Sequence, residues 1–330
     1  MAIRVLIVDD SALIRSLIGA IVNQQPDMLL VGAAPDAYVA RDMVNKFAPD
    51  VITLDIEMPK VDGLNFLEKL MKARPTPVLM ISTLTEHGAD ATLRALELGA
   101  VDFIAKPKLG ISEGIQRYQK VIVDKIRLVA MAKVKRVQPS SVSPPTQLPL
   151  LSTEKIIAIG ASIGGTEAIK KVLMAMPANS PAIVITQHMP PGFTTSFAKR
   201  LNDCCKVAVK EAMHDERILP GTAYLAPGAM HLKIVKSGAD YRTKLEPDGI
   251  VSGHKPSVDV MFESLVPFAN NVVAAILTGM GKDGAQGLRN IKHNGGFTVA
   301  QDEASCVVFG MPKVAIEQDA VMEVKDIHDI

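Results

Sequence analysis

The chain has 330 residues, of which 48% are hydrophobic and 22% charged, so its length and composition fit a globular protein of about two domains. Lysine and arginine number 36, and aspartate and glutamate 35. The net charge of +1 argues against a broadly basic nucleic-acid-binding surface. No apolar run approaches the roughly 18 residues of a membrane span. With three cysteines and no signal-peptide pattern, we expect a cytoplasmic protein.

A segment rich in proline and serine divides the chain. Residues 136–150 read RVQPSSVSPPTQLPL and contain no acidic residue. Prolines remove backbone donors and favour extended conformations, so this segment is typical of a semi-rigid linker. We therefore predict a first domain over residues 1–122, a helix end and linker over residues 123–150, and a second domain over residues 151–330.

Apolar runs and helix-spaced segments alternate before the linker. The expected strands are Val5–Val8, Met28–Val31, Val51–Leu54, Val78–Ile81 and Val101–Ile104. The expected helices are Leu13–Val22, Tyr38–Phe47, Leu64–Met71, Ala91–Leu98 and about 115–134. This alternation predicts an α/β domain of the flavodoxin type, with five parallel strands and helices on both faces.

The alternation resumes after the linker. The expected strands are Lys155–Ile159, Ala182–Thr186 and Val272–Leu277, and the expected helices are Thr166–Leu173 and Phe193–Leu201. The turn-rich segment Asp215–Asp248 is more typical of short antiparallel strands. The pattern predicts a second α/β domain with a doubly wound parallel sheet.

Chemically active residues follow four strands of the first domain. Asp9 and Asp10, Asp55, Ser82 and Lys106 each stand at or just beyond a predicted strand end. Parallel strands place these ends on one edge of the sheet, so the side chains should converge. Clustered carboxylates need a cation, and Mg²⁺ prefers oxygen ligands and phosphate. The pattern predicts an aspartate that accepts a phosphoryl group beside Mg²⁺ and a lysine.

The segments LIVDDS, TLDIEMPKVDG, LMIST and FIAKP resemble the response-regulator receiver domain over residues 1–122. The resemblance implies Asp55 as phosphoacceptor. It also implies Asp10 and Asp55 as Mg²⁺ ligands, helped by Asp9 and the main-chain carbonyl of Glu57. The remaining switch positions it implies are Ser82 as the hydroxyl, Phe103 as the aromatic residue and Lys106 as the phosphoryl contact.

A glycine-rich turn opens the second domain. Gly160-Ala161-Ser162-Ile163-Gly164 matches the G-x-S-x-G pattern of a nucleophile elbow, in which a strand-to-helix turn exposes a serine hydroxyl. The glycines also resemble a degenerate dinucleotide-binding fingerprint. That alternative needs an acidic residue after the next strand, where the chain reads Thr186-Gln187-His188. The pattern therefore favours a serine nucleophile.

Five histidines are candidate bases for this serine. His188 is preferred because it ends the next strand, on the same sheet edge as Ser162. The four others, which lie in turn-rich segments or helices, are His214, His231, His254 and His293. Asp283 lies in a glycine-rich turn after a buried strand and can orient the imidazole. Asp259 with His293 would give the order of classical α/β-hydrolases, but neither follows a clear strand.

The segments IGASIGGTEAI, TQHMPPGFTTSFAKRLN, AYLAPG, HKPSVDVMF, LTGMGKDGAQG and AQDEASCVVFGMP resemble the chemotaxis methylesterase family, the CheB family, over residues 151–325. The resemblance implies hydrolysis of glutamate γ-methyl esters on chemoreceptors and deamidation of certain receptor glutamines. It places the triad on Ser162, His188 and Asp283, with the Met280 main-chain N–H as oxyanion donor, and needs no cofactor at this site.

The two-domain organisation suggests regulation. A chemotaxis histidine kinase is the implied phosphodonor, and phosphorylation of Asp55 is expected to uncover Ser162 through Ser82 and Phe103. Two alternatives are a receiver that controls a receptor-docking module and a DNA-binding response regulator. Near-neutral charge and the lack of a short C-terminal helix-turn-helix argue against the latter. We expect a monomer that binds no nucleic acid and does not insert into membranes.

Overall fold

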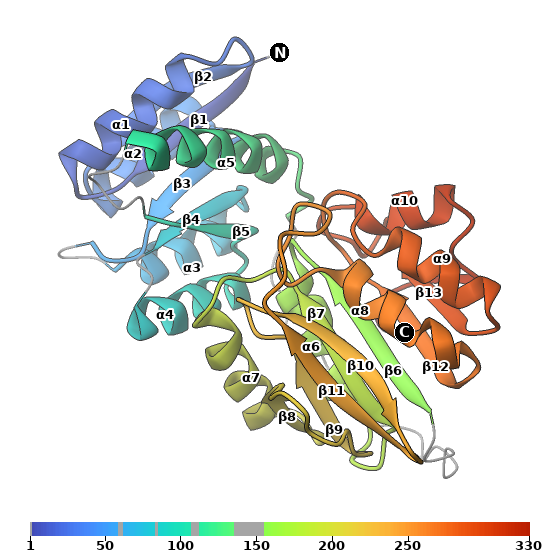
Figure 1. Cartoon of the computed structure of the whole chain (residues 1–330). Coiled ribbons are helices and arrows are strands. Elements are labelled where there is room, and N and C mark those ends of the chain that lie inside the picture. Colours follow the sequence, from blue (N-terminus) through green and yellow to red (C-terminus); the bar gives the residue numbers. More distant parts are fainter. Residues whose placement is uncertain (1, 59–61, 83–84, 107–111, 135–154) are drawn as a thin grey trace. The chain divides into compact units, whose positions relative to one another are not determined.

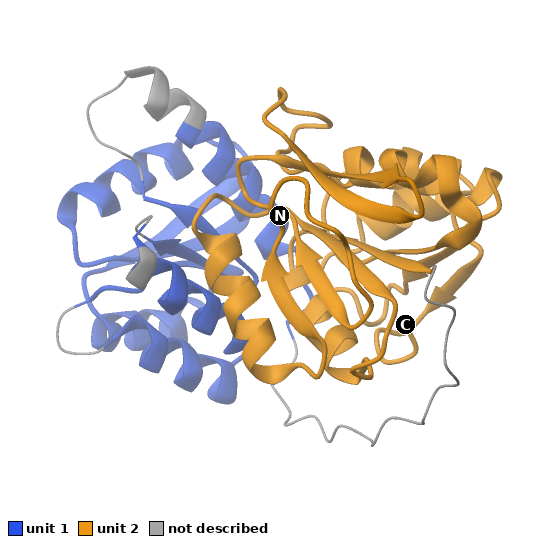
Figure 2. Ribbon diagram, turned by 60° about the horizontal axis from the view of Figure 1, so that its bottom comes forward, with its two compact units in different colours: residues 1–139 blue, residues 140–330 orange. Residues whose placement is uncertain are grey.

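The computed structural model describes the chain except for residues 1, 59–61, 83–84, 107–111 and 135–154. It divides into two compact units, residues 1–139 and 140–330, which Figure 2 colours separately. Most of the predicted linker falls outside the described residues, so its extended conformation stays a prediction.

The first unit is built on a parallel sheet of five strands in the order β2-β1-β3-β4-β5 (Figure 1). The strands are β1 (Ile3–Val8), β2 (Met28–Ala34), β3 (Val51–Asp55), β4 (Val78–Ser82) and β5 (Asp102–Ala105). The helices are α1 (Ala12–Asn23), α2 (Ala37–Phe47), α3 (Gly63–Ala73), α4 (Glu86–Glu97) and α5 (Ser112–Ala130). The flavodoxin-type sheet predicted from the alternating pattern is confirmed.

The first four helices of this unit begin at polar capping residues. Ser11, Asp36, Asp62 and Thr85 each accept a hydrogen bond from a backbone N–H of the helix that follows. Caps at these four positions fix where the chain leaves each loop. Every residue of β3 and β4 is buried, as expected for central strands covered on both faces.

The second unit is built on seven parallel strands in the order β14-β13-β12-β6-β7-β9-β8. These are β6 (Ile156–Ala161), β7 (Ala182–Gln187), β8 (Ala208–Glu211), β9 (Thr222–Leu225), β12 (Val272–Ile276), β13 (Phe297–Gln301) and β14 (Glu323–Lys325). The helices are α6 (Gly165–Ala175), α7 (Phe193–Cys204), α8 (Val258–Leu265), η1 (Val266–Asn271), α9 (Ala285–His293) and α10 (Met311–Glu317). The predicted doubly wound parallel sheet is confirmed.

The segment Asp215–Asp248 only partly matches its prediction. β10 (His231–Ser237) and β11 (Asp240–Glu246) form the expected antiparallel hairpin. The segment also contains β9, which instead joins the main sheet parallel to β7 and β8. β9 has only four residues, three of them buried, so its short apolar run gave no periodicity that could distinguish the two kinds of pairing.

Helices pack on both faces of the seven-stranded sheet. α6 and α7 contact each other, whereas α8 packs against α9 and the hairpin strand β10 (Figure 1). In the main core of this unit, buried residues of the sheet pack with Phe262 and Leu265 of α8 and with Leu288 of α9. This core fixes α8 against the sheet, which matters because the N-terminus of α8 faces the candidate site.

In each sheet, the strand order changes direction at a central strand. β1 has β2 on one side and β3 on the other, and β6 has β7 on one side and β12 on the other. Ligand sites of open α/β sheets lie at the carboxyl ends of strands beside such a switch point. The topology therefore marks the ends of β1 and β3 in the first unit, and the ends of β6 and β12 in the second.

Candidate functional site

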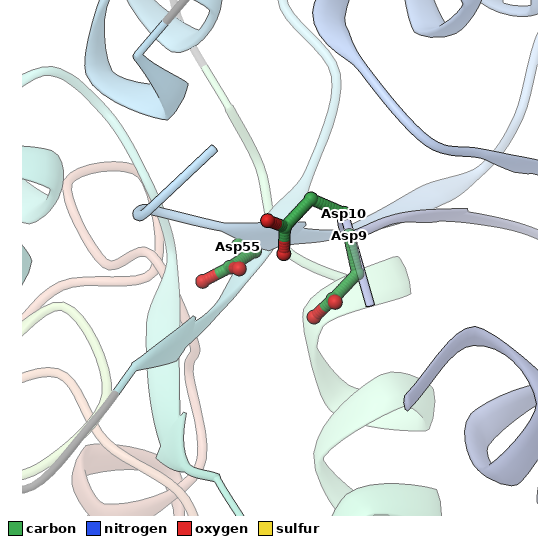
Figure 3. Close-up of side chains that lie close together, drawn as sticks. All are labelled: Asp9, Asp10 and Asp55. Carbon is green, nitrogen blue, oxygen red and sulfur yellow. The ribbon is translucent and has the colours of Figure 1, made fainter. Parts of the chain in front are cut away.

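Three carboxylates gather at the carboxyl edge of the first sheet. Asp9 and Asp10 follow β1 and Asp55 ends β3, and one ligand atom from each lies within 4.8 Å of the others (Figure 3). Lys106 Nζ lies 2.7 Å from Asp55 Oδ2 and 3.8 Å from Asp9 Oδ2. Asp55 is 1% exposed. The predicted convergence of the three carboxylates and the lysine is therefore present.

Burial makes this cluster electrostatically unusual. Desolvation raises the pKa of Asp55 to about 6, although the hydrogen bond from Lys106 opposes the shift. Desolvation also raises the pKa of Asp9, against the hydrogen bond from the Ser11 N–H. Burial alone would lower the pKa of Lys106, but its hydrogen bond to Asp55 and the nearby carboxylates raise it overall. The site thus concentrates negative charge that a single lysine does not fully balance.

The structure offers a specific test of whether a hard cation fits here. Asp9 Oδ2 is buried and makes no hydrogen bond within the described part of the chain. The Glu57 N–H donates to Asp55 Oδ1 at 3.2 Å, which brings the Glu57 backbone beside the cluster. A set of oxygen donors that includes a buried carboxylate oxygen without a hydrogen bond suits Mg²⁺. The residues therefore fit the ion.

The two expected switch residues lie inside the same unit. Ser82 ends β4, is 3% exposed, and its hydroxyl donates to the Gly88 carbonyl at 3.2 Å. Phe103 lies in β5 and is buried. Their strands are neighbours in the sheet, with Met80 opposite Phe103. The residues expected to respond to phosphate are therefore on adjacent strands, and their roles stay a prediction.

In the second unit, Ser162 occupies the turn from β6 into α6. Its carbonyl accepts the Gly165 N–H at 2.8 Å, which closes the turn. The left-handed residue is Gly164, with φ +76°, and not the serine. A Cβ at Gly164 would also come within 2.6 Å of Val307 Cβ. The strand–turn–helix context of a nucleophile elbow is present, with its unusual conformation at the glycine.

Backbone hydrogen bonds bring three strand ends together around this serine. The Ser162 N–H donates to the Thr278 carbonyl at 3.0 Å, and the His188 N–H donates to the Ala161 carbonyl at 3.1 Å. The Gln187 side chain adds a bond from Nε2 to the Ser162 carbonyl at 2.8 Å. These bonds fix the residues after β7 and β12 relative to Ser162.

His188 is bound at one ring edge by Asp283. Nε2 of His188 lies 2.7 Å from Asp283 Oδ2, and only 8% of the imidazole and 1% of the carboxylate side chain are exposed. The other ring nitrogen, Nδ1, is buried and makes no hydrogen bond within the described residues. Nδ1 is thus the nitrogen that can receive a proton. No hydrogen bond joins it to Ser162 in this structure, and catalytic bonds of this kind often tighten only with substrate.

Asp283 accepts four hydrogen bonds, which arrive in pairs. Oδ2 accepts from His188 and from the Val258 N–H, and Oδ1 accepts from the Ser257 hydroxyl and the Asp259 N–H. Burial alone would raise the pKa of Asp283, but its bonds from His188, Ser257 and Val258 lower it overall. Asp283 therefore remains ionised at neutral pH. It faces the N-terminus of α8, where the helix dipole favours an anion.

Backbone hydrogen bonds hold the residue before Met280 in place. The Gly279 carbonyl accepts bonds from the Gly310 and Met311 N–H groups. The N–H of Met280 donates to no acceptor in the described part of the chain, and the residue is 40% exposed. An unpaired N–H beside the serine turn is the kind of donor that an oxyanion needs.

The remaining histidines serve different purposes. His231 is fully buried, accepting the Ser257 N–H at Nδ1 and donating from Nε2 to the Gly249 carbonyl. His214 accepts the Leu245 N–H, and His293 is exposed at the end of α9. His254 is different, since its ring stacks on His188 at a centroid distance of 3.6 Å. The sequence pattern alone does not distinguish His254 from His214, His231 and His293.

Two further supporting residues were not anticipated. The Ser257 hydroxyl donates to Asp283 Oδ1. The Gln187 side chain donates to the Ser162 carbonyl. Both stand next to residues of interest in the sequence, within HKPSVD and TQHMP. Adjacency alone could have suggested them, but only the fold shows which way their side chains reach.

The second unit brings a serine turn, a histidine and a buried aspartate together in the manner of a serine hydrolase, and the first is a flavodoxin-type α/β unit with a carboxylate cluster. Residues 157–330 match the family model described as CheB methylesterase, and residues 5–117 match the response regulator receiver domain. The chain belongs to the CheB methylesterase family and carries a receiver domain.

Relatives match over almost the whole chain. A protein-glutamate methylesterase/protein-glutamine glutaminase 2 of Pseudomonas aeruginosa is 59% identical, covering 100% of this chain and 95% of that protein. A protein-glutamate methylesterase/protein-glutamine glutaminase of Salmonella typhimurium is 55% identical, covering 99% of this chain and 95% of that protein. The crystal structure of the Thermotoga maritima CheB methylesterase catalytic domain is 38% identical, with a TM-score of 0.52, and covers 53% of this chain and 94% of that one. In the parts of the chain that the structure describes, no helix has the length and hydrophobicity to cross a membrane.

Proposed function

We propose that this chain hydrolyses glutamate γ-methyl esters on chemoreceptors, releasing methanol, and deamidates specific receptor glutamines. The hydrogen bond between His188 and the buried, ionised Asp283, next to the Ser162 turn, is the observation that carries the proposal. The names of relatives that are 55–59% identical over almost the full chain support this choice of substrate.

In the first half of the reaction, Ser162 Oγ attacks the ester carbonyl and its proton passes to His188 Nδ1. Asp283 keeps the second ring nitrogen protonated and stabilises the imidazolium. The Met280 N–H donates to the oxygen that becomes negative in the tetrahedral intermediate. When this intermediate collapses, the methoxy group takes the proton from His188 and leaves as methanol. Ser162 is then acylated by the glutamyl side chain.

In the second half, His188 removes a proton from water, which attacks the acyl group. Ser162 leaves with the proton returned by His188, and the glutamic acid product on the receptor then loses its proton to water, which leaves a free carboxylate. A glutamine side chain follows the same route, with ammonia as the leaving group. One site therefore accounts for both activities.

We further propose that the activity is controlled through Asp55, with a chemotaxis histidine kinase as phosphodonor. The Asp55 carboxylate attacks the phosphoryl group, and the donor histidine leaves. Lys106 would contact the phosphoryl oxygens, a role supported by the ion pair between its ammonium and Asp55. Asp9, Asp10, Asp55 and the Glu57 carbonyl would hold Mg²⁺, which when bound neutralises phosphoryl and carboxylate charge. Ser82 and Phe103 would transmit the new state to the rest of the receiver.

The test measures methanol release from membranes that contain methylated chemoreceptors. Full-length wild type, Ser162→Ala and Asp55→Asn are compared, each with and without acetyl phosphate and Mg²⁺. We expect Ser162→Ala to lower release by about 10³-fold or more, because triad residues act as a unit. We expect Asp55→Asn to retain the unstimulated rate and to lose the stimulation.

Three results would contradict the proposal. Near-normal release by Ser162→Ala would show that this serine is not the nucleophile. Equal stimulation of wild type and Asp55→Asn would show that Asp55 does not control the activity. No release by any form would instead favour a receptor-docking module over an esterase.

A further inference from the structure

A second histidine ring covers the face of the proposed base. The rings of His188 and His254 have centroids 3.6 Å apart and planes only 9° from parallel. His188 follows β7, whereas His254 lies in the loop that precedes α8. Two rings from distant parts of the chain thus lie face to face beside the serine turn.

The loop around His254 is held by bonds that do not involve His188. Val251 and His254 exchange two backbone hydrogen bonds, at 3.1 and 2.9 Å. Between them, Ser252 and Gly253 have φ of 51° and 85°, a pair of left-handed residues that matches a type I′ turn. The Ser252 hydroxyl lies 3.3 Å from Asp259 Oδ2 in the first turn of α8. These bonds therefore hold the backbone of His254 in place independently of the contact between its ring and His188.

The same segment also holds the acid partner of the base. Three residues after His254, the Ser257 hydroxyl donates to Asp283 Oδ1, and the Val258 N–H donates to Oδ2. Asp283 fixes one edge of the His188 imidazole through Nε2. A bond at one edge leaves the ring free to tilt about that bond. A parallel ring at van der Waals distance removes this remaining freedom.

We propose that His254 is a positioning residue for catalysis. Its ring keeps the imidazole of His188 in the plane that joins Asp283 at Nε2 to the serine at Nδ1. The π face of His254 also lies against the positive charge that His188 acquires when it takes the proton from Ser162. The inference rests on the assignment of His188 as the base in the proposed function.

This role predicts an effect on turnover and little effect on substrate binding. His188 becomes charged only during the reaction, so a lost stack should lower kcat while KM stays nearly constant. A side chain that merely fills space would have a different signature. Its removal would lower the melting temperature and leave the kcat of the folded protein unchanged.

The experiment compares His254→Ala, His254→Leu and His254→Phe in the full-length chain. kcat and KM come from methanol release by methylated receptor membranes, and folding is followed by circular dichroism. We expect Ala and Leu to lower kcat about tenfold or more with KM within about twofold, because misorientation of a catalytic group is costly. We expect Phe, which restores a flat ring, to recover kcat to within about threefold of wild type.

Several outcomes would overturn the inference. One is a wild-type kcat in His254→Ala. Another is an equal fall in kcat in His254→Phe and His254→Leu, which would show that a flat ring is not what supports catalysis. A raised KM with unchanged kcat would make His254 a substrate contact instead. If the Ala variant does not fold, the Leu and Phe pair decides alone, because both retain side-chain volume. The ¹H shift of the His188 ring, which the facing ring should displace, gives a readout independent of turnover.

Two matched variants separate this inference from the proposed function. His188→Ala tests the base itself, and His293→Ala removes an exposed histidine at the end of α9 and should change nothing. If His188→Ala remains active, the proposed triad fails. If His188→Ala is inactive and His254→Ala has wild-type kcat, only the positioning role of His254 fails.

Discussion

Gly279 lies so close to Ser162 that a Cβ on Gly279 would come within 2.7 Å of the Ser162 Cβ and 3.0 Å of its backbone nitrogen. Real Cβ atoms essentially never come within 3.0 Å of another heavy atom, so the turn after β12 and the turn after β6 can meet this closely only through a glycine. The position of the proposed nucleophile thus depends on a residue that has no side chain.

The first prediction is that Gly279→Ala displaces Ser162 and lowers kcat by about 10²-fold, since a shift of about 1 Å at a reacting group can have that effect. Overpacking should also lower the free energy of unfolding by about 1–3 kcal/mol. Methanol release and thermal unfolding measure the two effects. Gly249→Ala is the control, because a Cβ there meets nothing within 4 Å. A fully active Gly279→Ala protein would mean that the serine turn adapts.

The second prediction concerns Asp283→Asn. Both carboxylate oxygens of Asp283 accept two donors each, so the amide nitrogen of asparagine faces two donors in either orientation. We expect kcat to fall by about 10³-fold or more, because the His188 tautomer is lost. Stability should fall by about 1–3 kcal/mol through the buried mismatch.

Single-turnover and unfolding measurements on Asp283→Asn test this directly. Asp319→Asn is the matched control, because it neutralises an exposed carboxylate that pairs with Lys292 on the surface. An Asp283→Asn protein with normal kcat but reduced stability would assign the carboxylate a structural role alone.

The third prediction follows from the burial of Asp55. Its pKa is raised from 3.8 to about 6, chiefly by desolvation, so the folded state binds this proton more tightly than the unfolded state. The ionised carboxylate therefore destabilises the fold increasingly as pH rises from about 4 to about 6, by about 3 kcal/mol in all. Asparagine mimics the protonated form, so Asp55→Asn should stabilise the receiver at pH 7 and have little effect at pH 4.

Unfolding of the full-length protein in metal-free buffer at both pH values measures this effect. Asp42→Asn, which alters an exposed carboxylate of α2, should show no such pH dependence. An Asp55→Asn protein that is no more stable than wild type at pH 7 would show that Lys106 compensates the carboxylate fully.

The parallel sheets explain why the main site residues could be predicted from the sequence. Asp9, Asp55, Ser162 and His188 each end a strand or directly follow one, and parallel strands bring those ends to one edge. Strand assignment alone therefore identified the residues that converge. To predict Asp283 as well, one had to assume that the glycine-rich turn after β12 returns to the same sheet edge.

The supporting contacts could not be predicted in the same way. His254, Ser257 and Val258 belong to a turn and a helix start whose position depends on the packing of α8 against the sheet and the hairpin. Local periodicity carries no information about that long-range packing. The same limitation affected β9, whose parallel pairing with β7 depends on the sheet and not on its own sequence.

The fourth prediction concerns Mg²⁺ and the receiver. If Asp9, Asp10 and Asp55 hold the ion, millimolar Mg²⁺ should raise the melting temperature of the receiver by a few degrees at pH 7.5, since a ligand that binds only the folded state stabilises it. The effect should shrink at pH 5, because the raised pKa values of Asp9 and Asp55 let protons compete with the ion. Calorimetry with and without Mg²⁺ at both pH values provides the measurement, with Asp42→Asn expected to behave as wild type and Asp10→Asn expected to lose most of the shift. An equal shift in Asp10→Asn would mean that the ion acts elsewhere on the chain, and the three-carboxylate site would have to be abandoned.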